Sequence, residues 1–177
     1  MIPKKPTVSQ LIDLLNKPAL IKWANKIGLQ GVSLDDYNKK STSNGSSIHL
    51  QIEKFLDYNV PFRDLQTQNN FVEFIKDKEI ITIEKDIYHD LFFGRLDIKF
   101  KFNGNIYICD FKPKNNYSTI FFEQKLQLAM YKYADECDKV GIISYPDFTL
   151  QEVEFDFEVY KRIIDCLCNL YNLKLLV

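Results

Sequence analysis

The sequence predicts an α/β fold in which a central mixed sheet is flanked by helices. Three observations lead to this prediction. Apolar residues recur at helical spacing in the N-terminal third, two β-prone runs flank an Asn-Gly pair, and helical and strand patterns alternate after that pair. Helices, a hairpin, a helix, further strands and a last helix are typical of an α/β sandwich.

The length and the composition fit an ordinary globular domain. The chain has 177 residues, of which 46% are hydrophobic and 27% charged, so it suits one domain with a real core. The net charge of −1 gives no overall basic field of the kind that attracts nucleic acid. Nucleic-acid binding would therefore need a local patch, which the overall balance neither supports nor excludes.

The first residues and the cysteines indicate a compartment. The N-terminal segment lacks the apolar core of a signal peptide, and no apolar run is long enough to cross a membrane. The four cysteines contain no CxxC pair, and we expect buried free thiols in a reducing cytoplasm. They are Cys109, Cys137, Cys166 and Cys168.

The N-terminal elements follow from cap residues and spacing. Thr7 with Gln10 forms a capping-box pattern that starts a first helix, and a second helix follows with Gly28 as its stop. The polar segment 35–47 is predicted to be a mobile connection, and a helix follows over residues 46–58.

The remaining elements are read from period and β-propensity. A long helix carries one apolar stripe, made of Phe122, Leu126, Ala129, Met130 and Tyr133. Gln124, Gln127 and Tyr131 line up on another face of the same helix. The predicted ranges are a helix over 69–77, a strand over 79–88, a hairpin over 94–114, a helix over 119–136, strands over 139–145 and 148–157, and a helix over 159–173.

The hairpin places two acids opposite each other. Asn103-Gly104 is the preferred pair for a two-residue type I′ turn. Counting outward from it pairs Asp97 with Asp110, and Arg95 with Lys112. Directly opposed residues have Cβ atoms roughly 4.5–5.5 Å apart, and Lys112 lies one pleat along on the same face as Asp110.

Two interpretations of this pair stand side by side. Close carboxylates repel, and a divalent cation such as Mg²⁺ or Mn²⁺ removes the penalty by taking both as ligands. Lys112 would then orient or deprotonate a water molecule on that cation. Alternatively, the acids face solvent, are screened by Lys99 and Arg95, and serve structure alone.

These residues resemble the PD-(D/E)xK nuclease superfamily, in particular its RecB-like branch. The branch has a Gly-x-x-Asp strand, an Asp/Glu-x-Lys strand, a helix with Gln-x-x-x-Tyr, and upstream a Gly-x-x-x-His-x-x-x-Glu helix. The matching residues here are Gly94 and Asp97, Asp110 and Lys112, Gln127 and Tyr131, and Gly45, His49 and Glu53. The N-terminal segment is also similar to small phage-type exonucleases and to the mitochondrial genome maintenance exonuclease.

The resemblance implies a fold and a division of the chain. It implies a restriction-endonuclease-like core with an N-terminal helical extension. We expect one nuclease domain over residues 1–177, in which residues 1–44 form a helical arm or arch and residues 45–177 the catalytic core.

The resemblance also implies a role for each site residue. The metal, Mg²⁺ or Mn²⁺, would be held by His49, Asp97, Asp110 and the Phe111 carbonyl. Lys112 would position the attacking water, and Gln127 and Tyr131 would orient the strand or support Lys112. Glu53, Glu84 and Gly94 would support the site. No iron–sulfur cluster is expected, because members of the branch that carry one have a Cys upstream of the motifs and this chain has none before Cys109.

DNA contacts are expected from a second group of residues. They are Trp23, Lys22, Lys26, Arg95 and Gln124. An aromatic ring between lysines suits base stacking and phosphate binding. The alternative for Trp23 is packing with Leu20 and Ile27 on one apolar helix face.

The function implied by the resemblance is a metal-dependent DNA exonuclease of phage-type replication or recombination. Its partner would be DNA, and whether that DNA is single-stranded stays open. No membrane partner is expected. Three alternatives remain: an endonuclease on the same fold, a catalytically silent protein that binds nucleic acid or a protein partner, and a plain structural domain.

Overall fold

The computed structural model describes residues 5–15, 18–31, 33, 35, 48–114 and 119–175, with the side chains of residues 18–23 excepted. The chain forms two compact units. The first consists of Met1–Leu14 with Asp64–Val177, and the second of Leu15–Arg63. The division at residues 44 and 45 stays a prediction, and the two units are described separately below.

The larger unit is built on a five-stranded mixed sheet with the order β1-β2-β3-β4-β5. Strands β3 and β4 are parallel, and the other neighbouring pairs are antiparallel. The predicted α/β fold with a mixed sheet flanked by helices is thus confirmed. The strands are β1 (Glu79–Tyr88), β2 (Phe93–Phe102), β3 (Asn105–Pro113), β4 (Lys139–Tyr145) and β5 (Thr149–Glu152).

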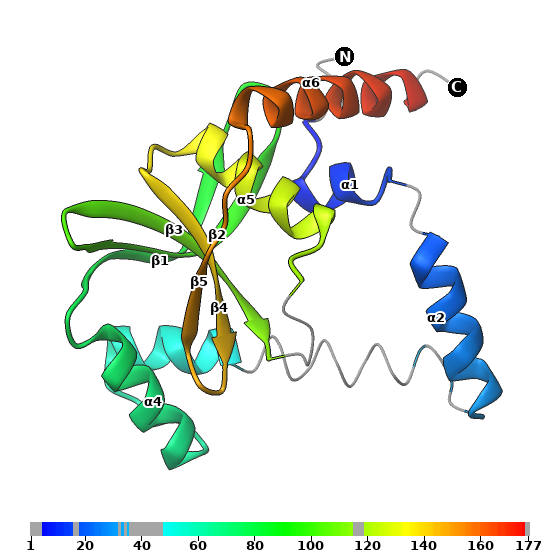
Figure 1. Cartoon of the computed structure of the whole chain (residues 1–177). Helices are drawn as coiled ribbons and strands as arrows, with labels where there is room; N and C mark the ends of the chain where they lie inside the picture. The colour runs from blue at the N-terminus through cyan, green and yellow to red at the C-terminus, as the bar shows by residue number, and fades with distance from the viewer. Residues whose placement is uncertain are drawn as a thin grey trace. The chain divides into compact units, whose positions relative to one another are not determined.

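Helices cover both faces of this sheet. In Figure 1, α5 and α6 lie on one side of it and α4 on the other. On the α4 side, Phe74 packs edge-on against Phe100 with ring centroids 5.8 Å apart, and Phe71 lies 5.0 Å from Phe148. The helices of this unit are α1 (Val8–Ile12), α4 (Leu65–Ile75), α5 (Phe122–Ala134) and α6 (Phe157–Lys174).

The start of α1 is the predicted capping box. Thr7 Oγ1 accepts a hydrogen bond from the Gln10 N–H, and the Gln10 side chain accepts one from the Thr7 N–H. Reciprocal bonds of this kind satisfy two backbone donors that the first helical turn leaves without partners.

The hairpin turn is also confirmed. Asn103 and Gly104 have φ values of 49° and 79°, as a type I′ turn requires. The strand register follows from the turn, and its first pair is Phe102 with Asn105.

The smaller unit contains two described helices, α2 (Pro18–Leu29) and a helix over residues 48–58. The predicted stop at Gly28 is one residue early, because α2 runs through that glycine to Leu29. Phe55 of the second helix packs edge-on against Phe62, with ring centroids 5.5 Å apart. The predicted mobile connection lies outside the described residues, apart from residue 35.

Several predicted boundaries and faces were wrong. Helix α5 contacts the sheet on one side and α1 and α6 on others, so its burial is broader than one stripe. Tyr131, expected on a polar face, is 3% exposed, whereas Phe122, in the first turn, is 43% exposed. The strand predicted over 148–157 is confined to β5. Cys166 lies on the outer face of α6 and is exposed, unlike Cys168.

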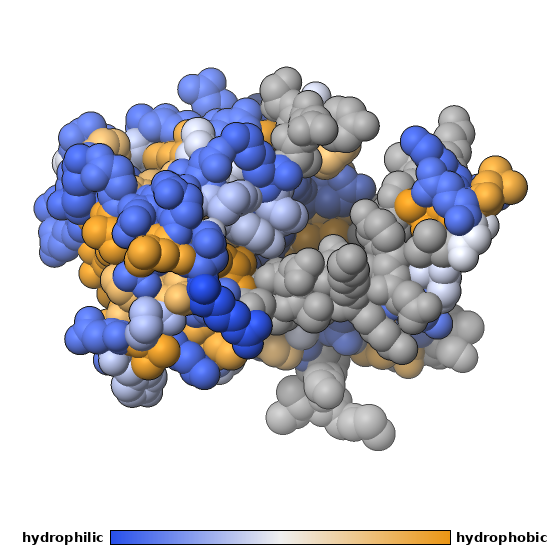
Figure 2. Space-filling model, turned by 90° about the horizontal axis from the view of Figure 1, so that it is seen from below, coloured by the Kyte–Doolittle hydropathy of each residue, from blue (hydrophilic) through white to orange (hydrophobic). Residues whose placement is uncertain are grey.

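The surface of the described chain is mixed. Figure 2 shows hydrophobic side chains in several small patches among hydrophilic ones, on the side where α4 lies. Leu65 and Val72 of α4 are among the exposed apolar residues. Within the described residues, every helix is too short or too polar to cross a bilayer.

Candidate active site

Asp97 and Asp110 are neighbours on adjacent strands, as the hairpin register predicts. The β2–β3 pairing runs without a shift to Ile98–Cys109, directly before the two acids. Beyond this pair, a side chain replaces the backbone as the hydrogen-bond acceptor. Asp97 Oδ2 accepts a 2.7 Å hydrogen bond from the Phe111 N–H. The two strands therefore stop pairing at the acids, and the predicted pair of Arg95 with Lys112 is not formed.

Glu84 extends this row to a third strand. It falls between the pairs Ile83–Ile98 and Lys85–Leu96 of β1 and β2, which puts it across from Asp97. One carboxylate oxygen of Glu84 lies within 4.8 Å of one of Asp97. Glu84 has a φ of 47°, an uncommon conformation for a residue other than glycine, and such outliers concentrate at functional sites.

The row is buried. Asp97 is 7% exposed and Asp110 2% exposed. Asp110 Oδ1 accepts a 2.8 Å hydrogen bond from Gln127 Nε2. Its Oδ2 forms an ion pair with Lys112 Nζ at 2.6 Å. The ammonium group of Lys112 thus compensates the charge of this buried carboxylate.

Lys112 is the cation of the site. Its side chain is 32% exposed and also lies 3.4 Å from Gln127 Oε1. Burial alone would lower the pKa of Lys112, but the charges of Asp110 and Asp97 outweigh it and raise that pKa above the ordinary value. The ammonium group is thus held charged beside the acids, where it can bind an anion or a water molecule.

Helix α5 contacts the site through Gln127. Gln127 and Tyr131 lie one turn apart on the same face of the helix. Gln127 Nε2 donates one hydrogen bond to the Tyr131 hydroxyl at 2.7 Å and one to Asp110. Burial, followed by the charges of Asp110 and Asp97, raises the pKa of Tyr131 well above its usual range. The Gln127 amide is therefore fixed between a phenol and a carboxylate.

Gly94 supports the site through packing. A Cβ atom at this position would lie 2.8 Å from Val8 Cγ2 and 3.8 Å from Tyr131 Cε1. Only glycine lets α1 approach the start of β2 this closely. The glycine therefore has a packing role here, close to Tyr131.

The alternative in which Lys99 and Arg95 screen the acids holds only for Arg95, whose Nε lies 3.9 Å from a Glu84 carboxylate oxygen. Lys99 Nζ pairs with Asp135 at 2.8 Å, at the end of α5. Arg95 Nε donates to the Glu84 carbonyl oxygen at 2.9 Å and lies 3.3 Å from an Asp86 carboxylate oxygen. Lys99 is thus turned to a distant acid, and Arg95 secures the unusual backbone at Glu84.

The other predicted site residues have the following surroundings. Gln124 Oε1 accepts a 2.9 Å hydrogen bond from the Phe121 N–H and so serves the start of α5. Lys26 is exposed on α2. His49 and Glu53 are half-buried on the helix over residues 48–58, in the smaller unit. The side chains of Lys22 and Trp23, and all of Gly45, lie outside the described residues.

Tyr145 is a neighbour of the site that the sequence analysis missed. It ends β4 in register with Pro113, and burial, opposed by the charge of Lys112, raises its pKa. Only the parallel β3–β4 pairing reveals this proximity. The sequence shows a strand there but not which strand lies beside it.

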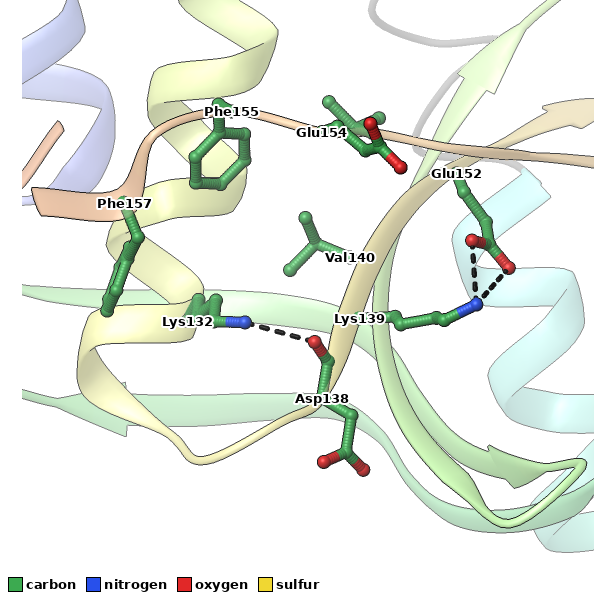
Figure 3. Close-up of a pocket in the computed structure, with 9 residues that line it drawn as sticks. Lys132, Asp138, Lys139, Val140, Glu152, Glu154, Phe155 and Phe157 are labelled. Carbon is green, nitrogen blue, oxygen red and sulfur yellow. Dashed lines mark hydrogen bonds and ion pairs between the residues drawn. The ribbon is translucent and has the colours of Figure 1, made fainter. Parts of the chain in front are cut away.

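A separate pocket of about 430 Å³ lies between the starts of β4 and α6 (Figure 3). Its two lysines are engaged. Lys132 Nζ donates to the Asp138 carbonyl oxygen at 3.0 Å, and Lys139 Nζ bonds to the Glu152 carboxylate at 2.9 and 3.1 Å. The pocket shares no residue with the acid row. Both of its lysines already bond to other groups of the protein, so neither is free to bind a phosphate.

The acid row fits a hard divalent cation. It presents carboxylate oxygens from Glu84, Asp97 and Asp110, and one oxygen each of Glu84 and Asp97 lie within 4.8 Å of each other. Oxygen donors of this kind suit Mg²⁺ or Mn²⁺ better than softer ions.

Comparisons with known proteins leave the function open. No protein-family model matches the sequence, and no curated protein is similar to it. One similar solved structure is described as "Crystal structure of SSO0001". It is 16% identical, with a TM-score of 0.48, over 96% of this chain and 79% of that one. A similarity this low carries no argument about activity.

Proposed function

We propose that this chain is a divalent-metal-dependent deoxyribonuclease, acting as an exonuclease, on a restriction-endonuclease-like core of the RecB-like type. The observation that supports it most is the buried pair of Asp97 and Asp110 on adjacent strands, with Lys112 Nζ 2.6 Å from an Asp110 oxygen. Two buried acids beside a single lysine are an arrangement in which a divalent cation would relieve the repulsion between the carboxylates.

The donors in the row fit the proposed cofactor. Asp97, Asp110 and Glu84 supply carboxylate oxygens, and the sequence motif proposes His49 and the Phe111 carbonyl as further ligands. A bound Mg²⁺ or Mn²⁺ would supply Lewis-acid charge to a phosphodiester and lower the pKa of a water molecule.

The protein groups have separate tasks in this proposal. Lys112, charged and one-third exposed, positions the attacking water and faces the negative charge that develops on the phosphate. Gln127 holds the Asp110 carboxylate from α5, and Tyr131 fixes the Gln127 amide. Asp97, bonded to the Phe111 N–H, ties the two strands at the reacting centre.

The test is degradation of end-labelled linear DNA, single-stranded and duplex, with closed circles as a second substrate. It is run in Mg²⁺, Mn²⁺ and EDTA with wild type, Asp110→Ala and Lys112→Ala. Lys114→Ala is the matched control, because Lys114 is two residues further along, is exposed, and pairs with Asp147 instead of the row. We expect metal-dependent shortening of linear DNA by wild type and the control, and at least a hundredfold loss in the two site variants.

Other outcomes overturn the proposal in distinct ways. Cleavage of closed circles would make the enzyme an endonuclease. Well-folded wild type that binds DNA but degrades none in either metal would be a binding protein without catalysis. Equal loss in Lys114→Ala would remove the special role of Lys112.

A further inference from the structure

A pocket of about 300 Å³, here called the α1–β2 pocket, lies where α1 meets the start of β2. Its lining includes Arg95 and Asp86, the hydroxyl-bearing Ser9, and the rings of Phe93 and Tyr131. The volume is at the lower end of the range of ligand-binding pockets. The pocket thus combines two opposite charges, a hydroxyl group and aromatic surface in a space for one small group.

Two residues connect this pocket to the acid row. Tyr131 lines the pocket, and its hydroxyl accepts a 2.7 Å hydrogen bond from Gln127, which also bonds to Asp110. Arg95 lines the pocket as well, and its Nε lies 3.9 Å from a Glu84 carboxylate oxygen. The α1–β2 pocket therefore borders the acid row.

The chain before α1 bounds the pocket at the start of β2. The Phe93 N–H donates to the Pro6 carbonyl oxygen at 3.0 Å, and Thr7 forms an isolated parallel β-bridge with Phe93. Phe93 precedes Asp97 by four residues of β2, which is about 13 Å along a strand. A DNA strand that enters from the acid row would meet this segment after that short distance, so the pocket suits the end of a strand better than its middle.

The charges in the pocket fit a phosphodiester beside a sugar hydroxyl group. Arg95 is bonded through Nε, and its two terminal nitrogen atoms form no hydrogen bond with the residues that the structure describes. A guanidinium group with such donors suits a phosphodiester. The Asp86 carboxylate, 3.3 Å from Arg95 Nε, can accept a hydrogen bond from a hydroxyl group. It would repel a terminal phosphate, which carries about −1.5 to −2 charges at pH 7.

We propose that the α1–β2 pocket receives the end of a DNA strand that carries a free hydroxyl group, with Arg95 on the adjacent phosphodiester and Asp86 on the hydroxyl. The inference rests on the proposed function and adds to it the chemistry of the preferred strand end. Specificity comes from repulsion of a phosphorylated end as well as from attraction of a hydroxyl end. In DNA with a 3′-hydroxyl and a 5′-phosphate, the pocket selects the 3′ end.

The test is degradation of an internally labelled oligonucleotide, alone and in a duplex, in its four end forms. These carry a hydroxyl or a phosphate at the 3′ end and a hydroxyl or a phosphate at the 5′ end. Wild type is expected to degrade the form with two phosphates about tenfold more slowly than the form with two hydroxyl groups. The two mixed forms tell whether the 3′-hydroxyl or the 5′-hydroxyl enters the pocket.

Variants of the pocket change the ratio of these rates, which does not depend on a general loss of activity. Asp86→Asn removes the repulsion and should reduce the ratio to less than about threefold, whereas Ser9→Asp adds a negative charge and should increase it. Asp90→Asn is the matched control, because Asp90 is an exposed acid between β1 and β2 that does not line the pocket, and it should leave the ratio unchanged.

The outcomes separate this inference from the proposed function. Degradation at equal rates for all four forms, or a ratio that Asp86→Asn leaves unchanged, keeps the nuclease and overturns the role of the pocket. If no form is degraded, the proposed function fails, and binding of the four forms is compared by fluorescence anisotropy in EDTA. A preference for hydroxyl ends that depends on Asp86 then keeps the pocket on a protein that only binds DNA, and absence of that preference overturns both.

Discussion

Replacing Gly94 by alanine tests the packing that holds α1 over β2. The new Cβ atom would lie 2.8 Å from Val8 Cγ2 and 3.3 Å from Val8 Cβ, and Val8 is 4% exposed. A β-branched valine has little freedom to turn away. Overpacking of this kind costs about 1–3 kcal/mol, from which the reduced entropy of the unfolded chain returns about 0.4–1 kcal/mol.

The expected net loss is about 1–2 kcal/mol, which is roughly 2–8 °C in melting temperature for a chain of this length. The assay is urea and thermal unfolding of wild type, Gly94→Ala, Val8→Ala and the double variant. In the Val8→Ala background the added methyl group has room, so Gly94→Ala should be neutral or slightly stabilising. An equal cost of Gly94→Ala in both backgrounds would refute the argument, because the two sites would then not be coupled.

Three further predictions concern a buried ion pair, the hairpin turn and helix α5. Burial raises the pKa of Asp135, but hydrogen bonds from Lys99 and a second lysine bring it below its ordinary 3.8. A carboxyl group whose pKa is lowered in the folded state stabilises the fold fully at pH values above 3.8. This stabilisation is lost as the pH falls through the lowered pKa. Asp135→Ala should therefore cost about 1–3 kcal/mol in urea unfolding at pH 7 and less at pH 3, and a cost independent of pH would contradict this. Gly104→Ala should cost about 1–2 kcal/mol in the same assay, since φ is 79°, and leave DNA degradation intact. Gln127→Ala should slow degradation roughly 10–100-fold at a similar melting temperature, whereas Gln124→Ala should lower the melting temperature and spare activity, and the reverse pattern would exchange their roles.

Local sequence rules were sufficient where one turn determines a register. The Asn103-Gly104 pair fixes the first β2–β3 pair, and each later pair follows by counting, so the proximity of Asp97 and Asp110 could be predicted. The capping box at Thr7 could be predicted for the same reason, because its partner is three residues away.

What could not be predicted depends on contacts between distant segments. Lys99 is adjacent in sequence to the acid row, yet its partner Asp135 lies 36 residues away and reaches it only after α5 has packed. Tyr131 is buried because neighbouring helices as well as the sheet cover α5. The backbone of Glu84 has a positive φ inside a strand, which no residue preference suggests.

The measurement that tests the account most directly is Mn²⁺ binding. Binding is monitored as the loss of the electron paramagnetic resonance signal of free Mn²⁺ when protein is added. Wild type, Asp97→Asn and Asp110→Asn are compared, with Asp147→Asn as the control, because Asp147 pairs with Lys114 outside the acid row. The account predicts that wild type and the control take up Mn²⁺ and that each site variant binds at least tenfold more weakly. Equal binding by all four proteins would contradict the claim that the buried acid row is the metal site.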